Sequence, residues 1–386
     1  MANINPADSI TGPSGHCGIV IRGAAAHEPS VARTSLLARL DAQDLAHCIT
    51  TREGTDAAGR YAAFALAGDQ AAAWAPDHDT LQLCERLQLD TDKRSADLTR
   101  EIVLALLLGP VAHEFPGIDE LVSAVRIRHA IVQAARRTTL DFQTSQAERP
   151  EDCWAYKEDC GFVLLPGASL IEALTKATQP EVSGALYSFS CYRATEYVML
   201  LGIAQELAHC NPPLLAQLQQ LWTTRPIKSG QFHDVFLREQ GSMECPLPQR
   251  YFVPGDRVWF RNPDAASAEA SGYEGSWVIY LGAGLFSNFW KRHQPFTLTA
   301  KCLEIYHWRN ALYIDAEGQE RIAEAKVEAL VAAALTDTNE VERILTLMQR
   351  YRDPRGYNNE GGCMDTTREF ARWVCPATSD LVLPVN

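Results

Sequence analysis

The chain has 386 residues, of which 46% are hydrophobic, and its formal net charge is −13 at pH 7. This length is sufficient for a substantial core in one large domain or in two to three smaller ones. The acidic balance, without a block of Lys or Arg, argues against nucleic acid and against an anionic membrane surface as partners. No apolar run in the sequence reaches the length of a transmembrane helix.

The N-terminal stretch MANINPADSITGPSG lacks the basic and apolar segments of a secretory signal. We therefore expect a cytoplasmic protein, and delivery to another cell would need a signal-independent route. The 11 cysteines are scattered singly, and no C-x-x-C pair occurs. This pattern favours reduced thiols and predicts neither a metal site nor any other cofactor.

Three regions are expected, with boundaries near residues 110 and 320. Residues 1–110 are predicted to be an accessory region without a chemical motif. It begins with the strand CGIVIRG and a helix in VARTSLLARLDAQDLAHCI, and it ends with the helix DLTREIVLALLLG. Between these helices, RYAAFALAG and AAAWAPDHDTLQLC predict a small sheet.

Residues 111–320 are predicted to contain helices followed by strands, which is the order of an α+β fold. The expected helices are GIDELVSAVRIRHAIVQAARRT, ASLIEALTKATQ, YRATEYVMLLGIAQELAHC and PPLLAQLQQLW. The third is apolar almost all round and should be central. The β-branched and aromatic segments FVPGDRVWFRNPD, SWVIYLG, FTLTAKCLEIYHW and NALYIDAEG predict antiparallel strands.

Residues 321–386 are predicted to form a helical C-terminal region. Its three expected helices are ERIAEAKVEALVAAAL, NEVERILTLMQRY and MDTTREFARWVC. No catalytic motif is evident in this part of the chain.

Cys191 is the candidate nucleophile, because it stands where a polar turn gives way to the central helix. The unpaired N–H groups and the dipole at a helix N-terminus stabilise a thiolate, and they could also hold an oxyanion. A base would come from the downstream histidines His209, His233, His293 and His307, of which His209 lies too far along the same helix. Position alone does not decide the matter, because a cysteine at a helix start is more often a small buried apolar residue.

Three motifs in register supply a resemblance. YSFSCYRATEYVMLLGIA, GDRVWFRNPD and GYEGSWVIYLG resemble the Y-x-F-E-C-A-T-A, G-D-x-x-Y-F-K-N-P-[DE] and W-x-G-E-N-V-I-x-L-G motifs of the bacterial spore-coat type of protein-glutamine gamma-glutamyltransferase. The helix ELVSAVRIRHAIVQAARR also resembles the family's helix upstream of its cysteine. The likeness covers roughly residues 115–320.

The resemblance implies a papain-like α+β core, in which the buried helix that opens at Cys191 packs on an antiparallel sheet. It also implies a calcium-independent bacterial transglutaminase with Cys191 as nucleophile. Such an enzyme forms a thioester with a protein glutamine and releases ammonia. A lysine or other amine then forms an isopeptide bond, whereas water would give deamidation. The expected partners are therefore protein substrates that supply the glutamine donor and the amine acceptor.

The chain departs from the family's pattern at both acidic positions. Ser190 stands where the family has an acid before its cysteine, and Ser276 stands in place of the acid of G-E-N. Glu274, two residues before Ser276, is the candidate replacement. The family's A-H-G-[IL]-G segment corresponds to LFSNFWKRHQPF, where a strict alignment selects Asn288 or Phe289 and a short insertion selects His293. We predict His293 as the base or ion-pair partner, because a thiolate without one is a poor catalyst.

Four residues are predicted to contact the substrate. Ser190 and Ser276 could donate hydrogen bonds, and Trp277 and Trp290 could line an apolar groove. The commoner roles for these residue types are a helix cap, an ordinary strand position and core packing.

Two other functions fit the same sequence. The first is a papain-like amidase or peptidase that acts as a toxin or effector, which the extra terminal regions and the missing acids would suit. The second is a binding protein that kept the fold after losing catalysis.

Overall fold

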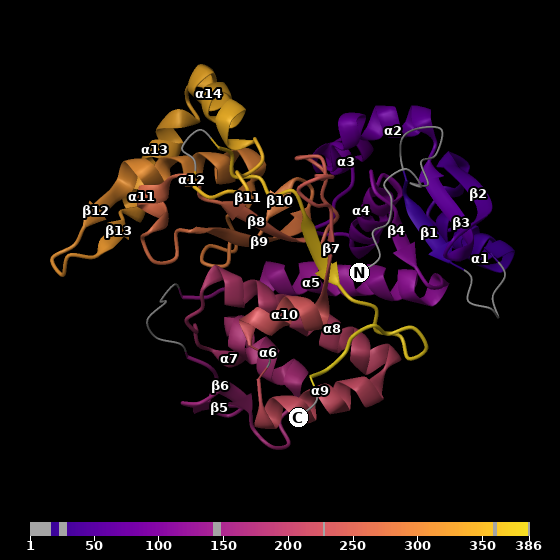
Figure 1. Cartoon of the computed structure of the whole chain (residues 1–386), viewed down its shortest axis with the longest axis horizontal. Helices are drawn as coiled ribbons and strands as arrows, with labels where there is room; N and C mark the ends of the chain where they lie inside the picture. The colour runs from indigo at the N-terminus through magenta and orange to yellow at the C-terminus, as the bar shows by residue number, and fades with distance from the viewer. Residues whose placement is uncertain (1–16, 23–28, 142–147, 227, 358–360, 385–386) are drawn as a thin grey trace.

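A computed structural model describes residues 17–22, 29–141, 148–226, 228–357 and 361–384 (Figure 1). It is a mixed helix and sheet structure with a four-stranded sheet near the N-terminus, a six-stranded sheet and two short two-stranded ribbons among these residues. None of the helices found there is both long and apolar enough to span a bilayer.

The N-terminal sheet has the strand order β2-β3-β1-β4. Its strands are β1 (Ile19–Arg22), β2 (Ile49–Asp56), β3 (Gly59–Leu66) and β4 (His113–Phe115). Strand β3 pairs antiparallel with β1 and β2, whereas β4 runs parallel to β1. Helices α1 (Pro29–Asp41) and α4 (Ser95–Leu107) contact this sheet, so the strand and helices predicted here are confirmed.

The predicted strand in AAAWAPDHDTLQLC is wrong, because this stretch is helical. It contains the end of α2 (Gly68–Trp74), the 3₁₀ turns η3 (Pro76–His78) and η4 (Thr80–Gln82), and the start of α3 (Leu83–Leu87). Pro76 opens one turn, and the Asp79 carboxylate caps the next by accepting from the Leu81 N–H. Proline and a capping aspartate favour turns and helix starts over a strand interior.

Two long helices form the centre of the molecule, and Figure 1 shows them below the strands of the six-stranded sheet. They are α5 (Ile118–Arg137) and α8 (Cys191–Cys210), and they pack against each other and against strand β9. Gly202 permits this approach, since a Cβ there would lie 2.6 Å from the Ile131 side chain and 3.0 Å from its backbone nitrogen. Helices α6 (Leu170–Thr178) and α9 (Pro212–Thr224) also pack against α8, so the predicted central position of α8 is confirmed.

The six-stranded sheet has the order β11-β10-β9-β8-β14-β7, with every neighbouring pair antiparallel. Its strands are β7 (Leu237–Gln240), β8 (Arg257–Arg261), β9 (Gly275–Gly282), β10 (Leu285–Phe286), β11 (Phe296–Thr297) and β14 (Arg368–Ala371). Strand β9 contacts α5 and α8, which brings the start of the central helix to the sheet.

FTLTAKCLEIYHW is a helix and not the predicted strand. Only Phe296–Thr297 pair as β11, and α12 (Leu298–Ala311) follows. Thr297 caps the helix by accepting from the Ala300 N–H. The buried residues recur at helical spacing, at Leu298, Cys302 and Ile305 among others. This period of three to four was hidden by the β-branched and aromatic composition.

The C-terminal region is only partly helical, so its prediction needs correction. Helices α13 (Glu324–Ala334) and α14 (Thr338–Met348) are confirmed, but MDTTREFARWVC contains strand β14 instead of a helix. Strand β14 lies between β8 and β7 in the sheet. Residues far along the chain thus complete the sheet on which α8 packs, and the domain boundaries near residues 110 and 320 stay predictions.

The remaining elements are short. Ribbon strands β5 (Trp154–Lys157) and β6 (Gly161–Leu164) pair with each other, as do β12 (Leu312–Ile314) and β13 (Glu320–Ile322). The other helical segments are η2 (Ala46–Cys48), α7 (Pro180–Ser183), α10 (Ser229–Phe236) and α11 (Ala265–Ala268).

Candidate active site

Helix α8 begins at Cys191 because Ser190 caps it. Ser190 has extended backbone angles, and its hydroxyl accepts a hydrogen bond from the Arg193 N–H at 3.3 Å. This is the usual geometry of a serine N-cap. The cap places Cys191 in the first turn, where backbone N–H groups have no partner within the helix. Ser190 was predicted either to donate a hydrogen bond to the substrate or to cap the helix, and the structure shows the helix cap.

The Cys191 thiol faces strand β9. The backbone N–H groups of Trp277 and Tyr192 donate hydrogen bonds to its sulfur, and the charge of Lys301 acts on it in the same direction. These three groups favour the thiolate, while the charge of Glu274 opposes it. Burial outweighs them and raises the pKa of the Cys191 thiol above its ordinary value. The resting site therefore holds a thiol with thiolate-stabilising groups around it.

Lys301 is a charged side chain in the interior, and it is not among the site residues predicted from the sequence. The residue is 2% exposed. Its ammonium donates to the Glu304 carboxylate at 2.6 Å and to the Ser276 hydroxyl at 3.3 Å, and it lies 3.4 Å from the centre of the Phe296 ring. A lysine among apolar positions at helical spacing was the available signal, and the strand assigned to this segment concealed it.

Trp277 lies in an aromatic and cationic stack beside Cys191. Its ring stacks on Trp259 with centroids 5.7 Å apart, and Tyr192 meets it edge-on at 5.3 Å. The buried Arg257 guanidinium lies 3.8 Å from the Trp277 ring centre and pairs with Glu369 of β14. The stack fixes the strand residue whose N–H holds the thiol.

The other predicted residues lie in different surroundings. Glu274 is exposed, and its charge acts on Cys191 in the direction that raises the pKa of the thiol. His293 is exposed and lies beside Arg292, whose Nε is 3.2 Å from its Nε2. Trp290 is half-buried against the main core and packs on Phe289. The structure thus brings Cys191, Glu274, Ser276 and Trp277 to one place, and no contact of the described residues joins His293 to that group.

A cavity of about 300 Å³ adjoins the start of α8. Ser190 and Arg193 line it together with Arg149, whose guanidinium lies over the Phe189 ring at 3.5 Å. Its size is near the lower end of ligand pockets. The cavity therefore opens beside Ser190, the residue directly before Cys191.

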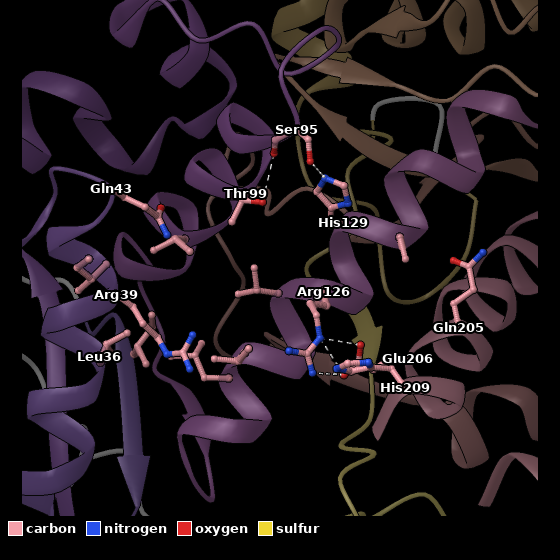
Figure 2. Close-up of a pocket in the computed structure, with 17 residues that line it drawn as sticks. Leu36, Arg39, Gln43, Ser95, Thr99, Arg126, His129, Gln205, Glu206 and His209 are labelled. Carbon is pink, nitrogen blue, oxygen red and sulfur yellow. Dashed lines mark hydrogen bonds and ion pairs between the residues drawn. The ribbon is translucent and has the colours of Figure 1, made fainter. Parts of the chain in front are cut away.

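A larger cavity of about 540 Å³ lies elsewhere (Figure 2). Figure 2 shows Arg126 paired with Glu206 on one side and His129 hydrogen-bonded to Ser95 on another. Glu206 is 15 residues beyond Cys191 on α8, about 20 Å along the helix at 1.5 Å per residue. This larger cavity therefore lies far from Cys191, which is at the opposite end of the helix.

No group of three or more His, Cys, Asp or Glu side chains capable of holding a metal ion occurs within the described ranges.

The family model of protein-glutamine gamma-glutamyltransferase matches residues 81–372. A solved transglutaminase from Geobacillus stearothermophilus, without its C-terminal extension, is similar at 19% sequence identity and a TM-score of 0.38. That match covers 56% of this chain and 98% of the other. No curated protein matches.

Proposed function

This chain belongs to the protein-glutamine gamma-glutamyltransferase family, and on that premise we propose that it transfers glutamine acyl groups through a thioester at Cys191. The family acts on protein substrates, and membership makes the chain a transferase. The supporting observation is the Cys191 thiol at the start of α8, held by two backbone N–H groups within reach of the Lys301 charge. We also propose that helix α8 and the antiparallel sheet form a papain-like core.

The reaction proceeds in two steps. The Cys191 thiolate attacks the carboxamide carbon of a protein glutamine, the C–N bond breaks, and ammonia leaves with a proton from the site or solvent. An amine then attacks the thioester carbonyl and loses a proton, the C–S bond breaks to return the sulfur as thiolate, and the isopeptide bond is formed. Water in place of the amine converts the glutamine to glutamate.

The N–H groups around Cys191 support this chemistry. Donors at a helix start stabilise negative charge on sulfur and on an oxyanion. The cavity beside Ser190 offers room for part of the substrate. The proposal does not depend on His293 as base, on Glu274 as replacement acid or on Trp290 as a substrate contact, and these sequence-based predictions are left to experiment.

The test is incorporation of a fluorescent primary amine into casein by the full chain, with EDTA present to exclude dependence on calcium. Cys191→Ala is expected to lower the rate at least about 10³-fold, because it removes the nucleophile. Cys245→Ala, which removes an exposed thiol outside the site, is the matched control. Full activity in Cys191→Ala would overturn the proposal.

The same assay separates the related reactions. Ammonia release with amine incorporation indicates transamidation, and ammonia release without incorporation indicates deamidation. Cleavage of the casein chain would indicate a peptidase instead.

A further inference from the structure

The ammonium of Lys301 is partly compensated inside the protein. Glu304, one turn away on α12, supplies the counter-charge, Ser276 supplies a hydroxyl, and Phe296 supplies a ring face. Burying a charge is costly unless its surroundings stabilise it. The Glu304 side chain remains 27% exposed, so this ion pair is partly screened by solvent. Side chains from three elements, α12, β9 and β11, thus surround the Lys301 ammonium.

Strand β9 connects this cation to the nucleophile. Ser276 accepts from Lys301, and the next residue, Trp277, donates its N–H to the Cys191 sulfur. Lys301 and Cys191 are therefore held by neighbouring residues of one strand, although α12 follows α8 by about ninety residues in the chain. Trp277 is itself fixed between Tyr192 and Trp259, which leaves the strand little freedom at this point.

We propose that Lys301 is the cation that stabilises the Cys191 thiolate, and that Ser276 positions its ammonium for this role. The inference rests on the proposed function and adds the residue that makes the thiol reactive. When Cys191 ionises, its proton passes to solvent or to the attacked substrate. No bond to Lys301 forms or breaks.

Other charged and titratable groups face the pair. Glu274, before β9, acts on Cys191 against the thiolate. Glu304 neutralises part of the Lys301 charge. The charge of Lys301 also acts on the buried Cys363 thiol. Glu274 thus opposes the thiolate directly, whereas Glu304 weakens the cation that favours it.

The experiment measures the rate of Cys191 carboxamidomethylation by iodoacetamide from pH 6 to 10, followed by mass spectrometry on the full chain. Alkylation reports the thiolate without requiring transfer activity. Lys301→Met is expected to slow alkylation at pH 8 by about tenfold and to move its midpoint to higher pH. Lys301→Arg should restore most of the rate, because it retains the charge.

Controls separate charge from structure. Lys326→Met removes an exposed lysine outside the site and should leave the profile unchanged. Glu304→Gln should increase the rate two- to threefold, since it removes the counter-charge while Lys301 remains. This opposite change is measurable even if Lys301→Met does not fold.

The outcomes also distinguish this inference from the proposed function. If folded Lys301→Met is alkylated with the wild-type profile, or if Glu304→Gln slows alkylation, Lys301 has only a structural role and the inference fails. If Cys191→Ala keeps full amine incorporation, the proposed function fails whatever the alkylation profile shows.

Discussion

The ammonium nitrogen of Lys301 lies 3.3 Å from the hydroxyl oxygen of Ser276, 25 positions earlier in the chain. This contact joins helix α12 to the strand that also holds the Cys191 thiol through the Trp277 N–H. The site is consequently assembled from α8, β9 and α12, three elements that share no sequence motif.

Activity should increase with pH from neutral to alkaline conditions. Burial raises the pKa of the Cys191 thiol, so the thiolate is a minor form at neutral pH and is lost as the pH falls through that pKa. An ordinary thiol is half ionised at about pH 8.5. We expect the kcat/KM of ammonia release from a glutamine peptide to reach its half-maximum above that pH. Ammonia release without an added amine keeps the ionisation of an acceptor out of the profile, and an optimum below pH 7 would contradict this prediction.

His293→Ala should change kcat/KM by less than about threefold. The side chain is exposed and lies against Arg292, and a general base must be within hydrogen-bond reach of the proton that it takes. The measurement is amine incorporation at pH 8, with Lys301→Met assayed beside it. A general base contributes typically about 10²–10⁴-fold, so a loss of that size in His293→Ala would establish the histidine as the base after substrate binds.

Gly202→Ala should destabilise the protein by about 1–3 kcal/mol, although alanine is the better helix former. The added Cβ would meet Ile131 at 2.6 Å from its side chain and 3.0 Å from its backbone nitrogen, and backbone cannot move aside cheaply. Urea unfolding followed by circular dichroism gives the free energy of unfolding. Gly230→Ala is the matched control, because nothing lies within 4 Å of a Cβ there. Equal stability of Gly202→Ala and wild type would show that α5 and α8 can separate without cost.

Arg372→Pro should reduce stability by about 1–3 kcal/mol more than Arg372→Ala does. The Arg372 N–H, directly after β14, donates to the Phe236 carbonyl at 2.8 Å, and proline lacks this donor. The alanine variant removes the same side chain and keeps the donor, so the difference between the two isolates the backbone hydrogen bond. Urea midpoints provide the comparison, and coincident midpoints would indicate that the C-terminal segment does not hold the sheet.

The sequence by itself determined the elements whose signals are local. The helical spacing of α4 and α5 and the apolar run of α8 placed these helices correctly, because each buries a face that its own sequence defines. It also identified Cys191 as the candidate nucleophile, since a capped helix start next to a cysteine is visible in consecutive residues.

Only the tertiary structure decided what surrounds the sulfur. Strand β14 was mistaken for a helix because its place between β7 and β8 depends on partners more than one hundred residues away. The sequence does not predict Lys301 as a site residue for a related reason. The composition of its segment favours a strand, and only the contact with Ser276 in the folded chain places its charge beside the site. Side-chain type and spacing can mark a reactive cysteine, but the charge that favours its thiolate depends on distances through space, which the folded chain alone fixes.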